Sequence, residues 1–347
     1  MTMTQFTNLK SFLKEAGLNP EHTSEAIRAE ASNRKYFRVT LTNPGTGPTS
    51  VVLCAGLAAP YGDEDHFIKL SEFLRQAGLP APRVLAVDRD QGRMLITDAG
   101  PTDLSDLLRE ANEATKERLL RQAIDLLIQL QRVSPPPVVV ERVFDTTKLQ
   151  AEMDYLFDAI HAICVTYDRP DPITFELRMF LKELCELIAK AEPRVFAHRD
   201  FHTRNIMARR DARTNEVELT LIDFQDARMG LPYYDLASLL YDPYAPLTLQ
   251  DRQMGLTYFR AKSDAQLPGQ GMYYAQALQR ILKALGTYLF QVHQKNHAVY
   301  LPTIPVALQR IEEICQLGRF PDSLFLFTRA LQREIYPALA GNVAAAT

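Results

Sequence analysis

The chain has 347 residues, of which 46% are hydrophobic and 23% are charged, and its formal net charge is −3 at pH 7. This composition is typical of a globular protein and excludes a disordered tail, a fibre and a strongly basic nucleic-acid binder. The length predicts two domains, or one large domain that is divided into two lobes.

Further sequence features bear on location and partners. No apolar run approaches the roughly 20 residues that a membrane-spanning helix needs, and the first residues lack a basic start followed by an apolar stretch. The four cysteines are scattered and form no CxxC pair, which is typical of a reducing compartment. We therefore expect a cytoplasmic monomer that has no membrane or nucleic-acid partner and acts on a small molecule.

The first hundred residues combine helical and strand patterns. Apolar residues at helical spacing predict helices at 6–17 and 63–78. Alternating or apolar runs bounded by turn residues predict four strands, at 35–42, 50–56, 83–88 and 93–100. The order strand, strand, helix, strand, strand indicates a small antiparallel sheet that carries one helix.

From residue 101 onwards the pattern is mainly helical. The predicted helices with a clear apolar stripe lie at 116–133, 151–163, 174–192 and 277–294. The proline-rich segment 134–144 is expected to be a loop. A second hairpin, with its turn at 211–216, interrupts the helices.

This second hairpin follows the segment that indicates chemistry. His198, Arg199 and Asp200 precede Asn205 with the spacing H-R-D-x-x-x-x-N, and Asp223 comes eighteen residues later. This order is that of the catalytic loop and metal-binding segment of kinases. An aspartate at a strand-to-loop junction can accept a proton from a hydroxyl, and amide and carboxylate oxygens suit Mg²⁺. The hairpin is expected to bring the oxygens of Asn205 and Asp223 to one rim; the alternative is that the aspartates only cap a turn and end a strand.

A wider resemblance is carried by the segments HRDFHTRNIM, IDFQDARMG and YYDLASLLYD, together with AEASNRKYFRV and LITDAGPTDL. Across roughly residues 31–242 the chain resembles the aminoglycoside phosphotransferase and choline kinase-like superfamily. Within it, the chain is most similar to bacterial kinases that phosphorylate N-acetylmuramate and N-acetylglucosamine at the anomeric carbon. The resemblance implies an α+β, protein-kinase-like bilobal fold, with an antiparallel-sheet N-lobe at 1–98 and a mainly helical C-lobe at 99–347.

The same resemblance implies roles for individual residues. Asp200 would be the catalytic base, Asn205 and Asp223 would hold Mg²⁺, and the acceptor would be an amino sugar of cell-wall recycling. ATP would be bound by backbone groups at the hinge and by polar or cationic side chains on the phosphate side. The hinge residues are Thr97, Asp98 and Ala99, and the phosphate-side residues are Ser32, Asn33, Arg34, Lys35 and Arg38. Alternatively, the cations among them line a solvated strand edge.

The chain also departs from protein kinases. The stretch that should cover the phosphates contains no glycine, and the strand lysine that clamps them is missing, with Cys54 near its place. No Ala-Pro-Glu sequence and no long activation loop follow Asp223, which argues against a polypeptide substrate.

Four residues are candidates for substrate contacts. His202 and Arg204 lie inside the catalytic loop, where each could touch substrate or the γ-phosphate, or support the loop. Asp235 could fix the catalytic loop by hydrogen bonds or cap its own helix. Asp242 could bind sugar hydroxyls or have a core or loop role.

Three functions remain open from the sequence. The first is an anomeric kinase for cell-wall amino sugars, and the second is a phosphotransferase for an aminoglycoside or another small alcohol. The third is a nucleotide-binding pseudokinase, suggested by the missing lysine and glycines. Segment 235–270 is not clearly acidic, whereas a cationic aminoglycoside should need an acidic rim, so the first function is favoured.

Overall fold

The computed structural model describes residues 8–27, 34–42, 44, 47–57, 62–211, 214, 216–264 and 266–346. The chain forms two compact units, and each is described by itself. Unit 1 contains Met1–Thr102 and Met207–Asp226, and unit 2 contains Asp103–Ile206 and Ala227–Thr347. The contacts therefore group segment 207–226 with the N-terminal residues, while the division into lobes at residue 98 stays a prediction.

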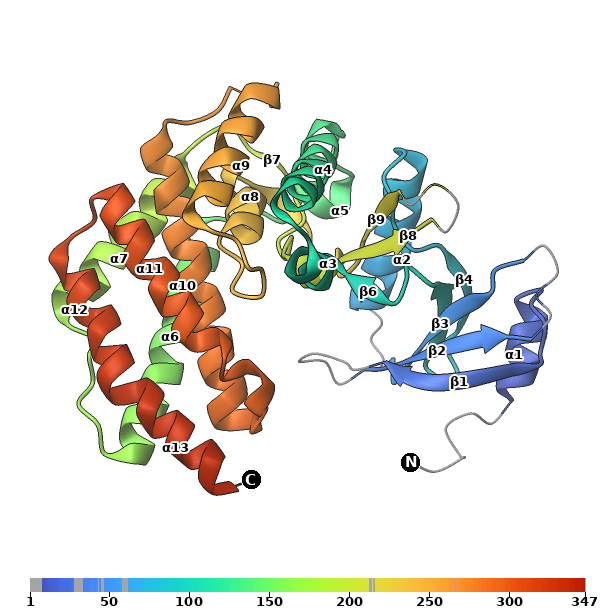
Figure 1. Ribbon diagram of the computed structural model, residues 1–347, viewed down its shortest axis with the longest axis horizontal. Helices are drawn as coiled ribbons and strands as arrows, with labels where there is room; N and C mark the ends of the chain where they lie inside the picture. Colours follow the sequence, from blue (N-terminus) through green and yellow to red (C-terminus); the bar gives the residue numbers. More distant parts are fainter. Residues whose placement is uncertain are drawn as a thin grey trace. The chain divides into compact units, whose positions relative to one another are not determined.

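Unit 1 is built on a five-stranded sheet with the order β1-β2-β3-β5-β4, in which all neighbours are antiparallel (Figure 1). Its elements are α1 (Leu9–Glu15), β1 (His22–Ile27), β2 (Lys35–Leu41), β3 (Ser50–Ala55), α2 (Gly62–Gln76), β4 (Val84–Asp88) and β5 (Arg93–Thr97). Successive side chains of β3 point to opposite faces. Val51 and Leu53 join the core that contains Phe12 of α1, whereas Val52 and Cys54 pack in a second cluster with Phe67 of α2.

The four predicted strands are confirmed as β2 to β5, but the sequence analysis missed β1. This strand, HTSEAI, is the outer neighbour of β2 and pairs His22 with Leu41. Four of its six residues are exposed, so it has no alternation of apolar and polar residues that would signal a strand. Its place at the edge of the sheet explains why it needs none.

A three-stranded sheet with the order β6-β8-β9 contains the second hairpin. Its strands are β6 (Thr102–Asp103), β8 (Ile206–Arg210) and β9 (Val217–Leu221). The backbone N–H of Leu221 donates to the carbonyl oxygen of Pro80 at 2.9 Å. The ring of Phe224 stacks on Phe67 of α2, with 4.9 Å between the ring centroids. The segment that follows β9 thus packs on α2 within unit 1.

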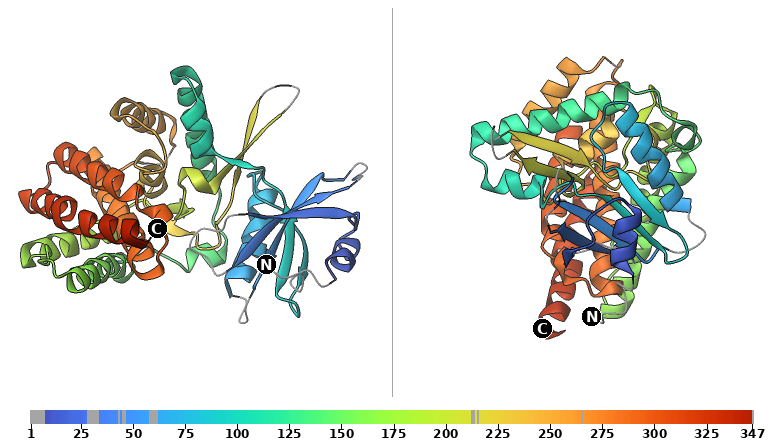
Figure 2. Two further views of the ribbon diagram at one scale, coloured as in Figure 1. Left: turned by 60° about the horizontal axis from the view of Figure 1, so that its bottom comes forward. Right: turned by 90° about the vertical axis from the view of Figure 1, so that its right-hand side faces the viewer.

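Unit 2 is mainly helical, and its long helix α10 packs against α6, α8 and α11 (Figures 1 and 2). Its helices are α3 (Leu104–Glu110), α4 (Glu113–Arg132), α5 (Pro137–Val140), α6 (Thr146–Tyr167), α7 (Phe175–Lys190), α8 (Tyr233–Leu240), α9 (Leu249–Lys262), α10 (Gln270–Lys295), α11 (Thr303–Gly318), α12 (Asp322–Ala330) and α13 (Tyr336–Ala346). The four predicted helices correspond to α4, α6, α7 and α10. The expected loop 134–144 contains the short helix α5, which begins at Pro137, because proline is pre-organised for a first helical position.

Gly286 allows α10 to approach α6 closely. A Cβ atom at this position would lie 2.9 Å from the Cα of Leu156 and 3.1 Å from its Cβ. We expect Gly286→Ala to lower the free energy of unfolding by about 1–3 kcal/mol, because backbone atoms must move apart. Gly271→Ala in the same helix is the control, since no atom lies within 4 Å of its added Cβ. Urea denaturation checks this, and equal midpoints for the two variants would contradict it.

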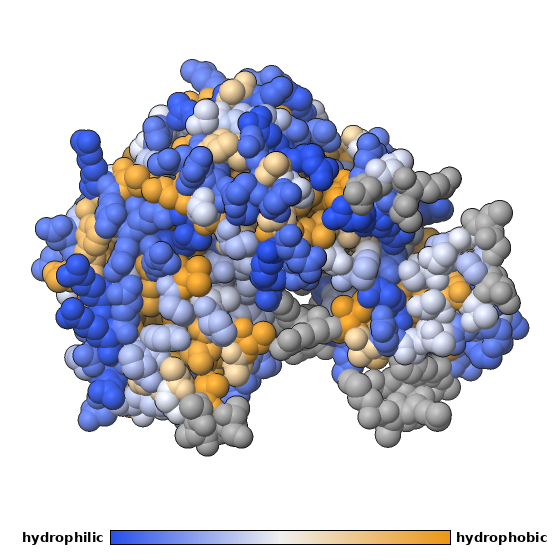
Figure 3. Space-filling view, in the orientation of Figure 1, coloured by the Kyte–Doolittle hydropathy of each residue, from blue (hydrophilic) through white to orange (hydrophobic). Residues whose placement is uncertain are grey.

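No described helix is long and apolar enough to cross a bilayer. The face drawn in Figure 3 is mainly hydrophilic, with hydrophobic residues in separate groups. Exposed large hydrophobic side chains occur on several elements, for example Val165 of α6, Phe175 of α7 and Leu326 of α12, which is ordinary for a globular surface.

Candidate active site

The predicted catalytic loop, residues 198–205, lies in unit 2 and follows β7 (Val195–Ala197), which pairs antiparallel with β10 (Arg228–Gly230). The loop closes on itself through backbone hydrogen bonds from His202 N–H to Asp200 O and from Asn205 N–H to His202 O, each 2.9 Å long. The amide nitrogen of Asn205 also donates to Asp200 O at 3.0 Å. Because that carbonyl can only accept, the orientation of the Asn205 amide is fixed.

Asp235 of α8 holds the start of this loop. Its carboxylate is fully buried and accepts the backbone N–H of His198 at 2.6 Å and that of Arg199 at 3.0 Å. Arg199 has a φ of 81°, a left-handed conformation that a non-glycine residue rarely adopts without support. The N-cap of α8 is Pro232, and no side chain caps this helix. Of the two roles weighed for Asp235, the structure therefore shows the one that fixes the loop.

Asp242, just beyond α8, holds the other end of the loop. Its Oδ2 accepts the backbone N–H of Thr203 at 2.8 Å and also the Thr203 hydroxyl, and its Oδ1 accepts the N–H of Tyr244 at 2.9 Å. Asp242 is 3% exposed. Oδ2 thus holds the predicted catalytic loop and Oδ1 holds the turn at Tyr244, while a contact of Asp242 with sugar hydroxyls stays a prediction.

Two cations from α10 meet the carboxylate of Asp200. The ammonium of Lys283 lies 3.0 Å from Oδ1, and Nη2 of Arg280 lies 3.4 Å from the same oxygen. Burial acts to raise the pKa of Asp200, but the charges of Lys283, Arg199 and Arg280 outweigh it and hold that pKa well below its usual range. Asp200 is therefore an ionised carboxylate.

The sequence analysis missed Lys283 and Arg280. Both lie in the predicted helix 277–294, which was interpreted only through its apolar stripe. The available signal was two cations three residues apart on a helix whose other residues in this region are mostly buried and apolar. Their side chains are only 16% and 8% exposed.

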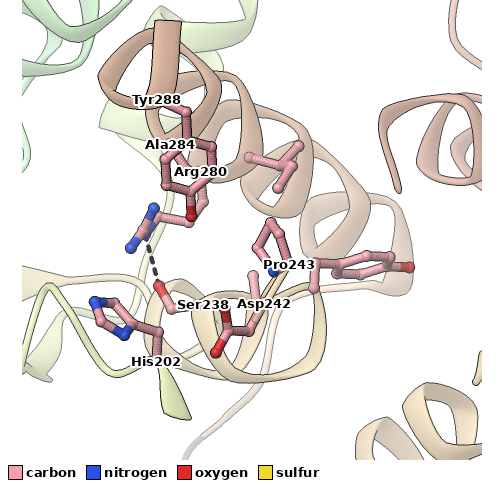
Figure 4. Close-up of a pocket in the computed structure, with 10 residues that line it drawn as sticks. His202, Ser238, Asp242, Pro243, Arg280, Ala284 and Tyr288 are labelled. Atoms are coloured by element: carbon pink, nitrogen blue, oxygen red, sulfur yellow. Dashed lines mark hydrogen bonds between the residues drawn. The ribbon is translucent and has the colours of Figure 1, made fainter. Parts of the chain in front are cut away.

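A small pocket in unit 2 adjoins these groups (Figure 4). Its walls come from the catalytic loop, α8 and α10, and include His202, Ser238, Asp242, Arg280, Ala284 and Tyr288. Arg280 donates from Nε to the Ser238 hydroxyl at 2.7 Å, shown as the dashed line in Figure 4, and reaches Asp200 with Nη2. One side chain thus joins the pocket wall to the proposed base.

The other loop candidate, Arg204, packs beside this pocket. Its guanidinium carbon lies 3.7 Å from the centroid of the Tyr244 ring, and the His202 ring lies 5.9 Å from the same centroid. Such an arginine–aromatic contact stabilises the loop. Contacts of His202 and Arg204 with substrate or phosphate stay predictions.

The two predicted metal ligands flank the hairpin strands. Asn205 immediately precedes β8, and Asp223 comes two residues after the end of β9. Asp223 has a φ of 64°, and its carboxylate accepts from the amide of Gln225 at 2.7 Å. An amide oxygen and a carboxylate are hard ligands that fit Mg²⁺. Among the described residues, no group of three or more His, Cys, Asp or Glu could hold a metal.

The predicted hinge lies at the end of β5 in unit 1. The backbone N–H of Thr97 donates to Arg83 O at 2.9 Å, and Asp98 O accepts from Nη2 of Arg209 at 2.6 Å. Within the described part of the chain, the N–H and carbonyl of Ala99 have no backbone partner. Of the three predicted hinge residues, Ala99 is therefore the one with neither backbone group in these hydrogen bonds, and a contact with adenine stays a prediction.

Arg38, expected on the phosphate side, is bound to this hinge. Its Nε donates to Oδ2 of Asp98 at 2.8 Å, and its Nη2 donates to Gly100 O at 2.9 Å. Lys35 is exposed at the start of β2, and Arg34 directly precedes it, whereas Ser32 and Asn33 lie outside the described residues. Roles toward phosphate stay predictions for all five.

Known proteins share this architecture. Residues 23–267 match the model of the phosphotransferase enzyme family, APH. The chain belongs to this family. A curated N-acetylmuramate/N-acetylglucosamine kinase of Pseudomonas aeruginosa is 28% identical over 316 residues, which cover 85% of this chain and 87% of that protein.

Two solved structures have the same fold at low sequence identity. The ADP-bound aminoglycoside phosphotransferase APH(2'')-Ib has a TM-score of 0.57 and 15% identity, and the match covers 90% of this chain and 99% of that one. A choline kinase from Cryptosporidium parvum Iowa II has a TM-score of 0.60 and 14% identity, covering 92% and 99%. The predicted family, the α+β protein-kinase-like fold and the phosphotransferase class are confirmed.

Proposed function

We propose that this phosphotransferase uses ATP to phosphorylate the anomeric hydroxyl of N-acetylmuramate or N-acetylglucosamine. The observation that carries the proposal is the carboxylate of Asp200, which two cations of α10 contact and hold ionised. The Pseudomonas aeruginosa relative, which matches over most of both chains, supports this choice of acceptor.

The electrostatics of Asp200 suit an anomeric acceptor. A carboxylate whose pKa is held this low is a weak base, and an anomeric hydroxyl is more acidic than an ordinary alcohol, so a weak base suffices. Asp200 would orient that hydroxyl and take its proton as the bond to phosphorus forms. Most of the rate enhancement would then come from positioning and charge stabilisation.

The surrounding charges disfavour a cationic acceptor such as an aminoglycoside. Lys283 and Arg280 flank Asp200, while the carboxylates of Asp235 and Asp242 are engaged by backbone N–H groups. Of the carboxylates of Asp200, Asp235 and Asp242, none besides Asp200 is therefore left to bind an amine. An uncharged or anionic sugar fits this excess of cations over available carboxylates better.

ATP and Mg²⁺ are the proposed cofactors. Asn205 and Asp223 would hold the ion, which when bound neutralises charge on the nucleotide phosphates. Ala99 would offer its backbone groups to adenine. The free and buried cysteines fit a reducing compartment, and we place the reaction in the cytoplasm.

A panel of acceptors tests this function. The protein is incubated with Mg-ATP and, separately, N-acetylmuramate, N-acetylglucosamine, glucose and kanamycin, and the products are examined by phosphorus NMR. We expect a phosphate doublet, split by the anomeric proton, with the two N-acetyl sugars. A product from kanamycin alone would contradict the proposal, and ATP binding without any phosphorylated product would favour the pseudokinase.

A further inference from the structure

The carboxylate of Asp200 is held by α10 through only one of its oxygens. Lys283 and Arg280 both contact Oδ1, at 3.0 Å and 3.4 Å. Oδ2 has no hydrogen-bond partner within the part of the chain that the structure describes, and the Asp200 side chain is 20% exposed. The carboxylate is thus anchored at Oδ1 and open to an acceptor hydroxyl at Oδ2.

The two cations differ in the donors that they have left. Arg280 gives Nε to Ser238 and Nη2 to Asp200. The ammonium of Lys283 has three N–H groups, of which the structure engages one, with Asp200, among the described residues. Its side chain is 16% exposed. Lys283 therefore has donors available beside the carboxylate that would carry out the chemistry.

A lysine at position 283 costs free energy, because burial removes water from its ammonium. Its neighbours on α10, Ile281, Leu282 and Leu285, are buried, and a leucine at 283 would avoid the desolvation of an ammonium. Burial lowers the pKa of Lys283, and Asp200 acts against that shift. Packing against these apolar neighbours does not account for a cation at this position, whereas its contact with Asp200 does.

We propose that Lys283 is a further catalytic residue, which anchors Asp200 through Oδ1 and donates a second N–H to the acceptor oxygen of the sugar. In the transfer step, the acceptor O–H bond breaks and its proton passes to Oδ2 of Asp200. The acceptor oxygen bonds to the γ-phosphorus, the bond from that phosphorus to the bridging oxygen of the β-phosphate breaks, and ADP leaves. The ammonium stabilises the negative charge on the acceptor oxygen. This inference rests on the proposed function.

Lys283→Met provides the first test, because it removes the charge but keeps most of the length. With the acceptor that the wild type phosphorylates fastest, we expect kcat to fall by about 10²–10³-fold. KM for the sugar should stay within about threefold, since the donor acts mainly on the developing charge. Lys182→Met, at an exposed position of α7, is the matched control and should change neither constant.

Chemical rescue provides the second test. Lys283→Cys should be as slow as the methionine variant, and 2-bromoethylamine should then restore at least about tenfold in kcat by rebuilding an ammonium at the length of lysine. Iodoacetamide, which adds an uncharged group, should not. The four native cysteines are buried, so the introduced thiol is the accessible one.

The outcomes separate the possible failures. If Lys283→Met keeps the kcat of the wild type, or if a folded Lys283→Cys is not rescued, the inference is overturned. If the unfolding midpoint of Lys283→Met falls so far that the loss of folded protein accounts for the loss of kcat, Lys283 only stabilises the fold, and the inference is also overturned. If Lys283→Met does not fold, the comparison of Lys283→Cys treated with 2-bromoethylamine and with iodoacetamide decides. By contrast, a wild type that phosphorylates only kanamycin defeats the proposed function, and the Lys283 comparison is then made on kanamycin.

Discussion

Replacing Asp200 with asparagine is expected to lower kcat by about 10²–10⁴-fold, because the amide cannot accept the proton of the acceptor hydroxyl. The substitution keeps the size of the side chain, and the backbone carbonyl of residue 200 still accepts from His202 and Asn205. The loop should therefore stay folded, and the affinity for Mg-ATP should be retained. Steady-state kinetics and calorimetric titration with a non-hydrolysable ATP analogue measure the two quantities.

Asp158→Asn is the matched control for this substitution. Asp158 is exposed on α6, so its charge can be removed without loss of a buried contact. We expect its kcat to equal that of the wild type. If Asp200→Asn retained the kcat of Asp158→Asn, Asp200 would not be the base.

Asp235→Ala is expected to lower the free energy of unfolding by about 3 kcal/mol and to abolish turnover. The substitution leaves the backbone N–H groups of His198 and Arg199 buried without their acceptor. It also removes the support for the left-handed backbone of Arg199, next to Asp200. Urea denaturation and kinetics under fully folding conditions measure the two effects. Full turnover in a folded Asp235→Ala would show that the loop does not depend on this carboxylate.

Because Asp235 titrates, its contribution to the free energy of unfolding is expected to depend on pH. Burial raises its pKa from 3.8 to about 7, so the folded state binds this proton more tightly than the unfolded state does. The contribution of protonated Asp235 to the free energy of unfolding is complete below the pKa that Asp235 has in the unfolded state. It is lost as pH rises through about 7. Asp235→Asn does not titrate here. Between pH 5 and pH 8 we expect the wild type to lose at least about 1 kcal/mol more stability than this variant.

Much of the fold was predictable, because its signals are local. Apolar stripes identified α4, α6, α7 and α10, and alternation or apolar runs identified strands β2 to β5. The exposed edge strand β1 and the short helix α5 lacked such patterns: four of six side chains of β1 are exposed, and α5 has only four residues. The family resemblance, carried by the motif around Asp200 and four further segments, supplied what periodicity alone could not.

The candidate site was predictable only where one motif contained it. The spacing of Asp200 and Asn205 is local, so the sequence showed it directly. The two oxygens of Asp235 and the cation of Lys283 act on residues far away in the chain, and only tertiary packing shows which groups they meet. For Asp235 the sequence left two roles open, since an aspartate near a helix start fits a cap as well as a distant loop.

The position of α8 has a consequence for how this enzyme could diversify. Asp235 within it and Asp242 just after it grip opposite ends of the catalytic loop, and α8 packs on α10, which carries Lys283. These contacts therefore join α8, α10 and the predicted catalytic loop within unit 2. We expect the selectivity of the proposed acceptor pocket to change through positions such as Ala284, whose side chain makes none of these contacts. Laboratory evolution toward new sugars would best begin there and leave α8 untouched.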